Sequence, residues 1–457
     1  MRNDEIREDK RIYTMSREKP LKAVLKMGLP LIAGMMVMSL YNLVDTFFIS
    51  LLHDDNQLAA VNLAYPISMV TVAVSNMIGT GAASLIARSL GADDRDLAEH
   101  TLTTGIELTV LISLVLGGLG LVFLSPIVTI LGAREHTFLF TEQYVSVILA
   151  GSIFTMGSYT LGQLLRSEGS TKYSMVGMIA GTIANIVFDP IFILVLGFGV
   201  RGAAIATILG NALGTLLPLS YYMRGKTLLR PAKRFWRPTA MILKEIFSVG
   251  VPAMLETGLT SIAYVVNNNL AVNYGELTVT AMGISQKIIS FGSYIYQGFA
   301  AGNQPLMGFN YGAKNYTRML SILRAGIIAV TSMELGVMTL LGIFAPALIG
   351  IFSGTNDVIR IGSQVLWANM WILPFVGSIS MTRTTFQAMG KPSYSFGITV
   401  MRQLLLYIPL LLLLNMLFAF SGMIWAQPIT EGIMMIISIL LLTHTLRRLQ
   451  STRCAAP

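Results

Sequence analysis

The chain has 457 residues, of which 54% are hydrophobic and 12% are charged, and its mean hydropathy is +0.66. A soluble globular chain carries about 25% charged residues, so this composition excludes a soluble domain and indicates a helical membrane protein. The net charge of +9 does not by itself indicate nucleic-acid binding, because basic residues gathered on one side of a membrane raise the net charge equally. The single cysteine, Cys454, excludes an intrachain disulfide and a cysteine-based metal site.

Twelve apolar stretches follow one another along the chain, each long enough to cross a hydrocarbon core of about 30 Å. They are 28–52, 59–87, 98–124, 143–164, 173–197, 201–223, 245–274, 277–309, 319–345, 361–386, 393–417 and 420–442. Such long runs exclude barrel strands, whose signal is short alternating segments. The first stretch is too long for the core of a signal peptide, so we expect it to remain as a membrane span.

The positions of lysine and arginine predict the orientation of these spans. With the N-terminus inside, the cytoplasmic segments contain 25 of the 32 basic residues and the outside loops contain three. Short cytoplasmic loops carry an excess of Lys and Arg. We therefore expect both termini in the cytoplasm, in the cytoplasmic (inner) membrane of a prokaryote.

Short sequence matches recur between the two halves of the chain. "MGLP", ending at Pro30, matches "VGVP", ending at Pro252, and "SLGA", ending at Ala92, matches "NYGA", ending at Ala313. Two further matches, "EGSTKYS" with "MGKPSYS" and "VRGAAIA" with "FSGMIWA", lie at nearly the same spacing of about 221 residues. A constant spacing is the signature of an internal duplication.

The longest basic segment separates the duplicated halves. We expect an N-terminal lobe at 1–223, a cytoplasmic linker at 224–244 and a C-terminal lobe at 245–457. Each lobe has six spans, an even number, so both lobes enter the membrane from the same side. This predicts an all-α polytopic fold built from a parallel repeat, with a cavity between the lobes.

Acidic residues inside the spans are candidates for function, because a charge at mid-bilayer costs about 2.5–3.5 kcal/mol on insertion scales. The candidates are Asp45, Glu107, Asp189, Glu256, Glu334 and Glu431. For Glu107, Glu334 and Glu431 we favour a structural role, in which each acid faces another helix and is satisfied there. Glu256 is left open between the two roles. The second half also contains possible basic partners, namely Lys287, Arg324, Arg383 and Arg402.

Asp45 and Asp189 differ from the other acids because they lie at one depth. With a helical rise of 1.5 Å per residue, Asp45, Asp189 and Thr207 lie ~10, ~12 and ~9 Å below the outer ends of their spans. Asn185 precedes Asp189 by four residues and Asn42 precedes Asp45 by three, so each pair shares a helix face. Apart from Arg201, at the outer end of its span, the first half contains no Lys or Arg within a span.

Pro190 follows Asp189 directly. It cannot donate a hydrogen bond to the Ile186 carbonyl, and its ring crowds that carbonyl. A freed carbonyl inside a membrane needs another partner. Carboxylates, an amide, a hydroxyl and this carbonyl are hard oxygen ligands, so the sequence predicts a site for a small cation or a proton.

At these residues the chain resembles the multidrug and toxic compound extrusion (MATE) family, in its DinF-like or MepA-like branches. The resemblance rests on "GLPLIAGMMVMSLYNLVDTFFI" in the first span and on "NIVFDP" and "GAAIAT" in the fifth and sixth. It rests also on "GFAAGNQPLMGFNYGAKNYTR" after the eighth and on "MRQLLLYIP" in the eleventh. It covers nearly the whole chain in order.

The resemblance implies two six-helix lobes in a V shape and an antiporter, not an enzyme, that exports structurally diverse, often cationic, drugs. It implies Na⁺ or H⁺ as the coupling ion and no other cofactor or metal. It also implies drug-like substrates, a lipid environment, no nucleic acid and no obligate protein partner. The coupling site carried over from the family is Asp45, Asn185, Asp189 and Thr207, and Pro30 matches the proline near which the first helix bends.

A promiscuous substrate cavity needs flexible apolar, aromatic and neutral polar side chains. Methionine is flexible and polarizable, and tyrosine offers a π face to a cation. Plain packing explains any single methionine equally well. The candidates for lining this cavity are Met38, Tyr41, Asn42, Glu256, Asn268, Tyr294 and Gln297.

Two other functions fit a polytopic chain. A flippase for lipid-linked oligosaccharides has a related architecture, but it should line its cavity with Arg and Lys, and few bases lie within the spans. A membrane enzyme acting on a diphosphate could hold Mg²⁺ at "GADDRD" (91–96), which otherwise reads as a solvated turn. No Gly-rich phosphate-binding loop occurs. The sequence does not distinguish Na⁺ from H⁺, and it leaves a second coupling site at Glu256 in doubt.

Overall fold

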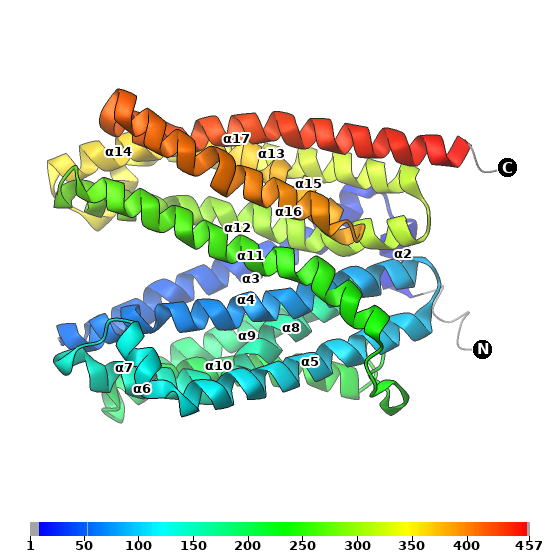
Figure 1. Cartoon of the computed structure of the whole chain (residues 1–457), viewed down its shortest axis with the longest axis horizontal. Coiled ribbons are helices and arrows are strands. Elements are labelled where there is room, and N and C mark those ends of the chain that lie inside the picture. The colour runs from blue at the N-terminus through cyan, green and yellow to red at the C-terminus, as the bar shows by residue number, and fades with distance from the viewer. Residues whose placement is uncertain (1–8, 53, 455–457) are drawn as a thin grey trace. The chain divides into compact units, whose positions relative to one another are not determined.

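The computed structural model describes residues 9–52 and 54–454, and it is helical throughout its regular elements (Figure 1). The side chains of 40–43, 45–47, 50, 55 and 446–454 lie outside that description. The elements of the first half are α2 (Lys10–Ser16), α3 (Pro20–Ser50), α4 (Asp55–Gly91), α5 (Arg95–Val122), α6 (Leu124–Ile130), α7 (Glu135–Ala150), α8 (Ser152–Ser167), α9 (Thr171–Pro190), η1 (Ile191–Val195) and α10 (Gly199–Met223). Those that follow are η2 (Lys233–Phe235), α11 (Ala240–Val272), α12 (Glu276–Gly312), α13 (Tyr316–Phe352), α14 (Asn356–Met370), α15 (Ile372–Ala388), α16 (Pro392–Val400), η3 (Met401–Tyr407) and α17 (Ile408–Cys454).

A helix or a pair of helices covers each of the twelve predicted spans. By length and composition, eight helices within the described residues can cross a membrane, or ten if each of two bent pairs forms one span. One of the eight, Pro392–Thr445, has 54 residues and would be about 81 Å long if straight. It breaks at Ala419, where φ is 50° and ψ is −135°, and so covers two predicted spans. α12 coincides with the predicted span 277–309.

The described helices form two compact units. Unit 1 comprises Met1–Thr14 and Ala33–Met254, and unit 2 comprises Met15–Ile32 and Leu255–Pro457. The three divisions fall inside helices, in α2, α3 and α11, and not in the linker. The compact units therefore do not match the duplicated halves of the sequence. Residues 15–32 of the first half belong to unit 2, and residues 245–254 of the second half belong to unit 1.

Glycines allow these exchanged segments to pack closely. In unit 2, a Cβ on Gly302 of α12 would lie 2.6 Å from the Met27 carbonyl oxygen of α3. In unit 1, a Cβ on Gly81 of α4 would overlap the Ile246 carbonyl of α11. Gly81 and Gly302 are separated by the repeat spacing, so the same close backbone contact occurs once in each unit.

Each unit has its own apolar core. In unit 1, Ile78, Leu102 and Leu164 belong to one buried cluster and Val145 belongs to another. Large apolar side chains, such as Ile130, also cover the outer faces of the helices. Apolar surface on this scale is unusual for a soluble protein and matches a chain surrounded by lipid.

Candidate functional site

Two pairs of glycines bring α9 and α10 together in unit 1. Gly177 and Gly181 are four residues apart on α9, as are Gly210 and Gly214 on α10. A Cβ on Gly181 would lie 2.7 Å from the Gly210 carbonyl oxygen, and one on Gly210 would lie 2.6 Å from the Gly181 carbonyl oxygen. Glycines at this spacing let membrane helices approach through their backbones. Polar side chains next to these glycines are therefore held close to the opposite helix.

Asn185 and Asp189 continue the glycine face of α9. Residues four apart lie above one another on a helix, and both side chains are buried, with 3% of Asn185 and 0% of Asp189 exposed. The Asn185 Nδ2 donates a hydrogen bond to Thr207 Oγ1 on α10 over 3.3 Å. The Asn185 Oδ1 is buried and accepts no hydrogen bond from the described residues. An amide oxygen and a carboxylate thus lie one turn apart on a buried face, where each can act as an oxygen ligand.

The helix changes its winding directly after Asp189. α9 ends at Pro190, and the π-helix η1 follows from Ile191 to Val195. The Leu196 N–H donates to the Ile191 carbonyl, five residues back, over 2.9 Å. Pro190 brings no N–H of its own to the helix, and single turns of π-helix occur frequently at functional sites. The winding therefore changes from α to π directly after Pro190, and the contribution of Pro190 to the site stays a prediction.

The other predicted residues of this site are only partly described. Asp45 lies on the part of α3 that belongs to unit 1, but its side chain, like those of Tyr41 and Asn42, lies outside the described residues. Its participation with Asn185, Asp189 and Thr207 stays a prediction. Pro30 lies in α3, which is helical on both sides of it.

The acids of unit 2 are mostly paired. Glu256 on α11 forms an ion pair with Arg383 on α15. The Arg402 Nε donates to Glu431 Oε1 and Oε2 over 2.8 and 3.0 Å, and its Nη2 donates to Oε1 over 2.6 Å. This two-pronged contact confirms that Glu431 is satisfied by a basic partner. Glu256 is likewise part of a salt bridge in this structure.

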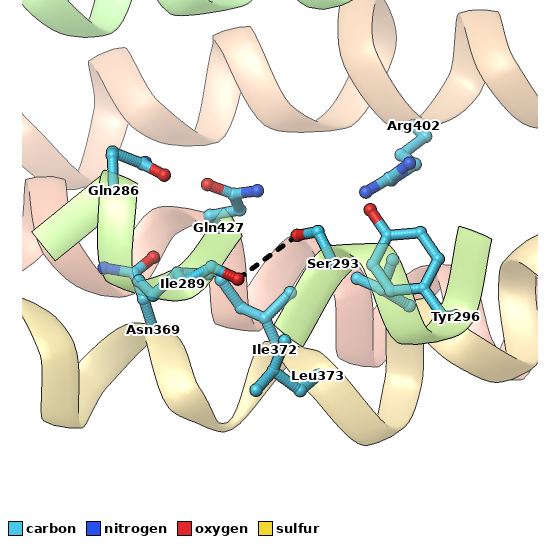
Figure 2. Close-up of a pocket in the computed structure, with 10 residues that line it drawn as sticks. Gln286, Ile289, Ser293, Tyr296, Asn369, Ile372, Leu373, Arg402 and Gln427 are labelled. Carbon is cyan, nitrogen blue, oxygen red and sulfur yellow. Dashed lines mark hydrogen bonds between the residues drawn. The ribbon is translucent and has the colours of Figure 1, made fainter. Parts of the chain in front are cut away.

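A polar cavity of about 80 Å³ lies inside unit 2 (Figure 2). It is lined by Gln286, Ile289, Ser293, Tyr296, Asn369, Ile372, Leu373, Val376, Arg402 and Gln427. Figure 2 shows the Arg402 guanidinium beside the Tyr296 hydroxyl at one end, with the three amide side chains toward the other. Sequence reasoning missed this cavity, although the amides within apolar spans could have indicated it.

Among the described side chains, none of those predicted to line a substrate cavity lines the cavity in unit 2. Met38, Tyr294 and Asn268 are partly exposed elsewhere, and Gln297 is exposed. Tyr296, two residues after Tyr294, contributes the aromatic ring instead. The predicted substrate cavity residues therefore stay a prediction.

A further buried acid, Glu168, lies in the turn between α8 and α9, outside the spans. Its Oε2 accepts a hydrogen bond from the Leu229 N–H over 2.9 Å and its Oε1 accepts one from Ser170 Oγ over 2.8 Å. The Arg11 Nη1 lies 3.8 Å from Oε1. Burial is the largest effect and raises the pKa of Glu168 to about 7, against the lowering by these donors and by Arg11.

Comparison with protein families shows which family this chain belongs to. The MatE family model matches it twice, at residues 30–191 and 252–413. The chain belongs to the MatE family. The two matched stretches are equal in length and start 222 residues apart, which confirms the internal duplication read from the sequence and the resemblance to MATE transporters.

Similar proteins include other members of the MatE family. The multidrug export protein MepA of Staphylococcus aureus (strain MSSA476) is 28% identical over 95% of this chain and 96% of its own. MepA of Staphylococcus haemolyticus is 28% identical over 93% of this chain and 94% of its own. These relatives are transporters, and the chain is accordingly a membrane transporter and not an enzyme.

Solved structures show the same fold. An outward-facing multidrug resistance MATE family transporter of the MOP superfamily is 27% identical, with a TM-score of 0.93 over 97% of this chain and 99% of that chain. A MOP superfamily transporter from Pyrococcus furiosus, described as having a binding pocket of reverse polarity, is 27% identical, with a TM-score of 0.91 over 96% and 99% of the two chains. The predicted all-α transporter fold is confirmed.

Proposed function

We propose that this MatE transporter exports drug-like, often cationic, organic compounds in exchange for Na⁺ or H⁺. The proposed coupling site is formed in unit 1 by Asp45, Asn185, Asp189 and Thr207. The observation that carries the proposal is the fully buried Asp189 carboxyl, one turn from an amide bonded to Thr207. A buried carboxylate is stabilised by a bound cation or neutralised by a proton, so occupancy of this site by either ion changes the local charge.

The substrate class is supported by the relatives that cover nearly the whole chain, which are named as multidrug export proteins. We further propose that the transporter lies in the cytoplasmic membrane of a bacterium with both termini inside. The support is the excess of basic residues in the segments placed inside.

A lipid-linked oligosaccharide flippase fits the structure less well. Binding a diphosphate would need unpaired basic side chains in the spans, whereas Arg383 and Arg402 are neutralised by Glu256 and Glu431.

A diphosphate-processing enzyme also fits less well, because the acids of "GADDRD" serve the turn between α4 and α5. Asp94 caps α5 by accepting from the Leu97 N–H, and Asp96 pairs with Arg234. These contacts engage the side chains that a Mg²⁺ site would need.

The test uses purified protein in liposomes with an imposed Na⁺ or H⁺ gradient and a fluorescent cationic drug. We expect Asp189→Asn to abolish gradient-driven transport, because the buried amide can neither take up a proton nor offer a negative charge to a cation. Asp357→Asn is the matched control, because this carboxylate is exposed and pairs only with neighbouring Arg360 among the described residues. Wild-type transport by Asp189→Asn at equal protein level would refute the proposed coupling site.

Separate Na⁺ and H⁺ gradients in the same assay identify the ion. If neither gradient drives drug transport by the wild type, the antiport proposal itself is wrong. If one gradient drives it and Asp189→Asn retains it, the transport class stands and the ion couples at other residues.

A further inference from the structure

Glu334 occupies the centre of a membrane helix in unit 2 and is unlike the paired acids around it. It lies eighteen residues from either end of α13, and none of its surface is exposed. Neither carboxyl oxygen has a hydrogen-bond partner in the described part of the chain. The backbone of Tyr296 on α12 faces the carboxyl without reaching hydrogen-bond geometry.

Helices α12, α14 and α15 pack against α13 along its length, and Arg318 near its start bonds to the Met15 and Glu18 carbonyls. From α12, Tyr296 is the titratable side chain near Glu334, while Glu276 and Lys287 are exposed. From α15, Gly377 abuts the acid, since a Cβ there would lie 3.7 Å from Glu334 Cγ.

The charged residues on these helices are engaged elsewhere. Arg383 of α15 pairs with Glu256, and the two charged residues of α14, Asp357 and Arg360, pair with each other at the surface. On α13 itself, Arg324 is exposed. No described basic group is therefore placed to balance an ionised Glu334.

A carboxylate that is buried without a counter-ion or a donor is strongly disfavoured, and such groups are found neutral instead. Paired acids escape this penalty, as Glu431 does through Arg402. The surroundings of Glu334 therefore require a proton on its carboxyl.

Two residues that line the polar cavity of unit 2 connect it to the surroundings of Glu334. Tyr296 lines the cavity (Figure 2) and also lies near Glu334. Val376, which lines the cavity as well, directly precedes Gly377, the residue next to Glu334 Cγ. A polar cavity of about 80 Å³ has room for several water molecules. A water there can accept the proton as the carboxyl becomes a carboxylate.

We propose that Glu334 is a second proton-binding site of this transporter, located in unit 2 and exchanging its proton through the polar cavity. The protonation of Glu334 does not depend on the coupling site of unit 1. Only its contribution to transport rests on the proposed antiport function.

Infrared spectroscopy of the purified full chain tests the protonation directly, through the carbonyl stretch that only a protonated carboxyl gives. We expect the wild type to show this band at neutral pH and Glu334→Gln to lose the part of it due to Glu334. Glu276→Gln, which alters an exposed acid at the start of α12, should leave the band unchanged. An identical band in the wild type and Glu334→Gln would overturn the proposal.

If Glu334→Gln cannot be purified, Glu334→Asp replaces it. The shorter side chain keeps a carboxyl but moves it toward α13, so the band should shift, and an unshifted band would equally overturn the proposal.

A second measurement asks whether the proton is linked to substrate. Calorimetric titration of a cationic drug in buffers of different ionisation enthalpy counts the protons exchanged on binding. We expect Glu334→Gln to exchange fewer protons per drug than the wild type. An equal number of protons in the two proteins would mean that Glu334 takes no part in the transport cycle. A failure of Asp189→Asn to affect transport would concern unit 1 alone and leave both readouts on Glu334 intact.

Discussion

Gly210→Ala is expected to disturb the proposed coupling site without altering any polar side chain in it. The new Cβ would lie 2.6 Å from the Gly181 carbonyl oxygen and 2.9 Å from the Asn185 Cβ. Ordinary contacts begin at 3.4 Å, and a backbone carbonyl in a packed helix cannot turn aside. α9 and α10 must therefore separate locally by up to about 0.8 Å, the shortfall from ordinary contact.

The same separation acts on the hydrogen bond between Asn185 Nδ2 and Thr207 Oγ1, which is already 3.3 Å long. A comparable displacement takes it beyond hydrogen-bond length. Overpacking costs about 1–3 kcal/mol, and the lost hydrogen bond about 0.5–1.5 kcal/mol. We expect Gly210→Ala to lower the free energy of unfolding by about 1.5–4.5 kcal/mol through overpacking and the lost hydrogen bond together.

Unfolding of the purified protein in detergent and gradient-driven transport in liposomes provide the two readouts. Gly118→Ala on α5 is the matched control, because nothing lies within 4 Å of the added Cβ and alanine favours a helix over glycine by about 0.5–1 kcal/mol. We expect Gly210→Ala to be less stable than this control and to transport more slowly at a given cation gradient. Equal stability of the two variants would refute the close packing of α9 and α10.

Arg402→Met should lower the free energy of unfolding by about 3–5 kcal/mol because it leaves Glu431 buried without its partner. Adding Glu431→Leu should recover most of that loss in the same denaturation experiment, and no recovery would mean that Arg402 acts by packing alone. For Glu168, whose pKa is raised from 4.5 to about 7, the folded state binds more protons than the unfolded state between these pH values. Stability should fall by roughly 3 kcal/mol as pH rises through that window; melting curves of Glu168→Gln from pH 4.5 to 7.5 should lack this decline, and an unchanged decline would assign it to other groups.

The helices could be predicted from the sequence because a lipid environment allows the backbone few conformations. The duplication could be predicted because short motifs recur at a constant spacing. A chain in hydrocarbon must satisfy its own N–H and C=O groups, so long apolar runs become helices. The breaks inside two predicted spans were not foreseen. α7 and α8 meet at 50° around Gly151, and α14 and α15 meet at 41° around Trp371. Whether a helix bends at such a point depends on neighbouring helices, which a single apolar run does not reveal.

For the polar residues, too, the sequence predicts which side chains share a helix face but not which distant side chains they pair with. The shared face of Asn185 and Asp189 follows from a spacing of four residues, and the structure confirms that both are buried and that Asn185 bonds to Thr207. The sequence offered basic partners for the acids of the second half, but only the packing of α11 on α15 assigns Arg383 to Glu256.

Glu334 shows where the sequence argument was wrong. We predicted that it would be satisfied by another helix, yet its oxygens have no hydrogen-bond partner among the described residues. Nothing in the neighbouring sequence distinguishes it from Glu431, because the difference is the presence or absence of a side chain from a distant helix.

Because residues 15–32 belong to unit 2, this unit cannot finish folding until the second half of the chain has been synthesised. Residues 15–32 are made early, but their partners in unit 2 are made late. The Asn310 Nδ2 donates to the Met15 carbonyl across a separation of 295 residues, and Arg318 donates to the Glu18 carbonyl. At about 5–20 residues per second, the start of α3 waits roughly 15–60 s for these contacts. The earliest membrane segment of the chain is thus among the last to reach its place, so the insertion machinery of the cell must tolerate an unfinished first helix throughout translation.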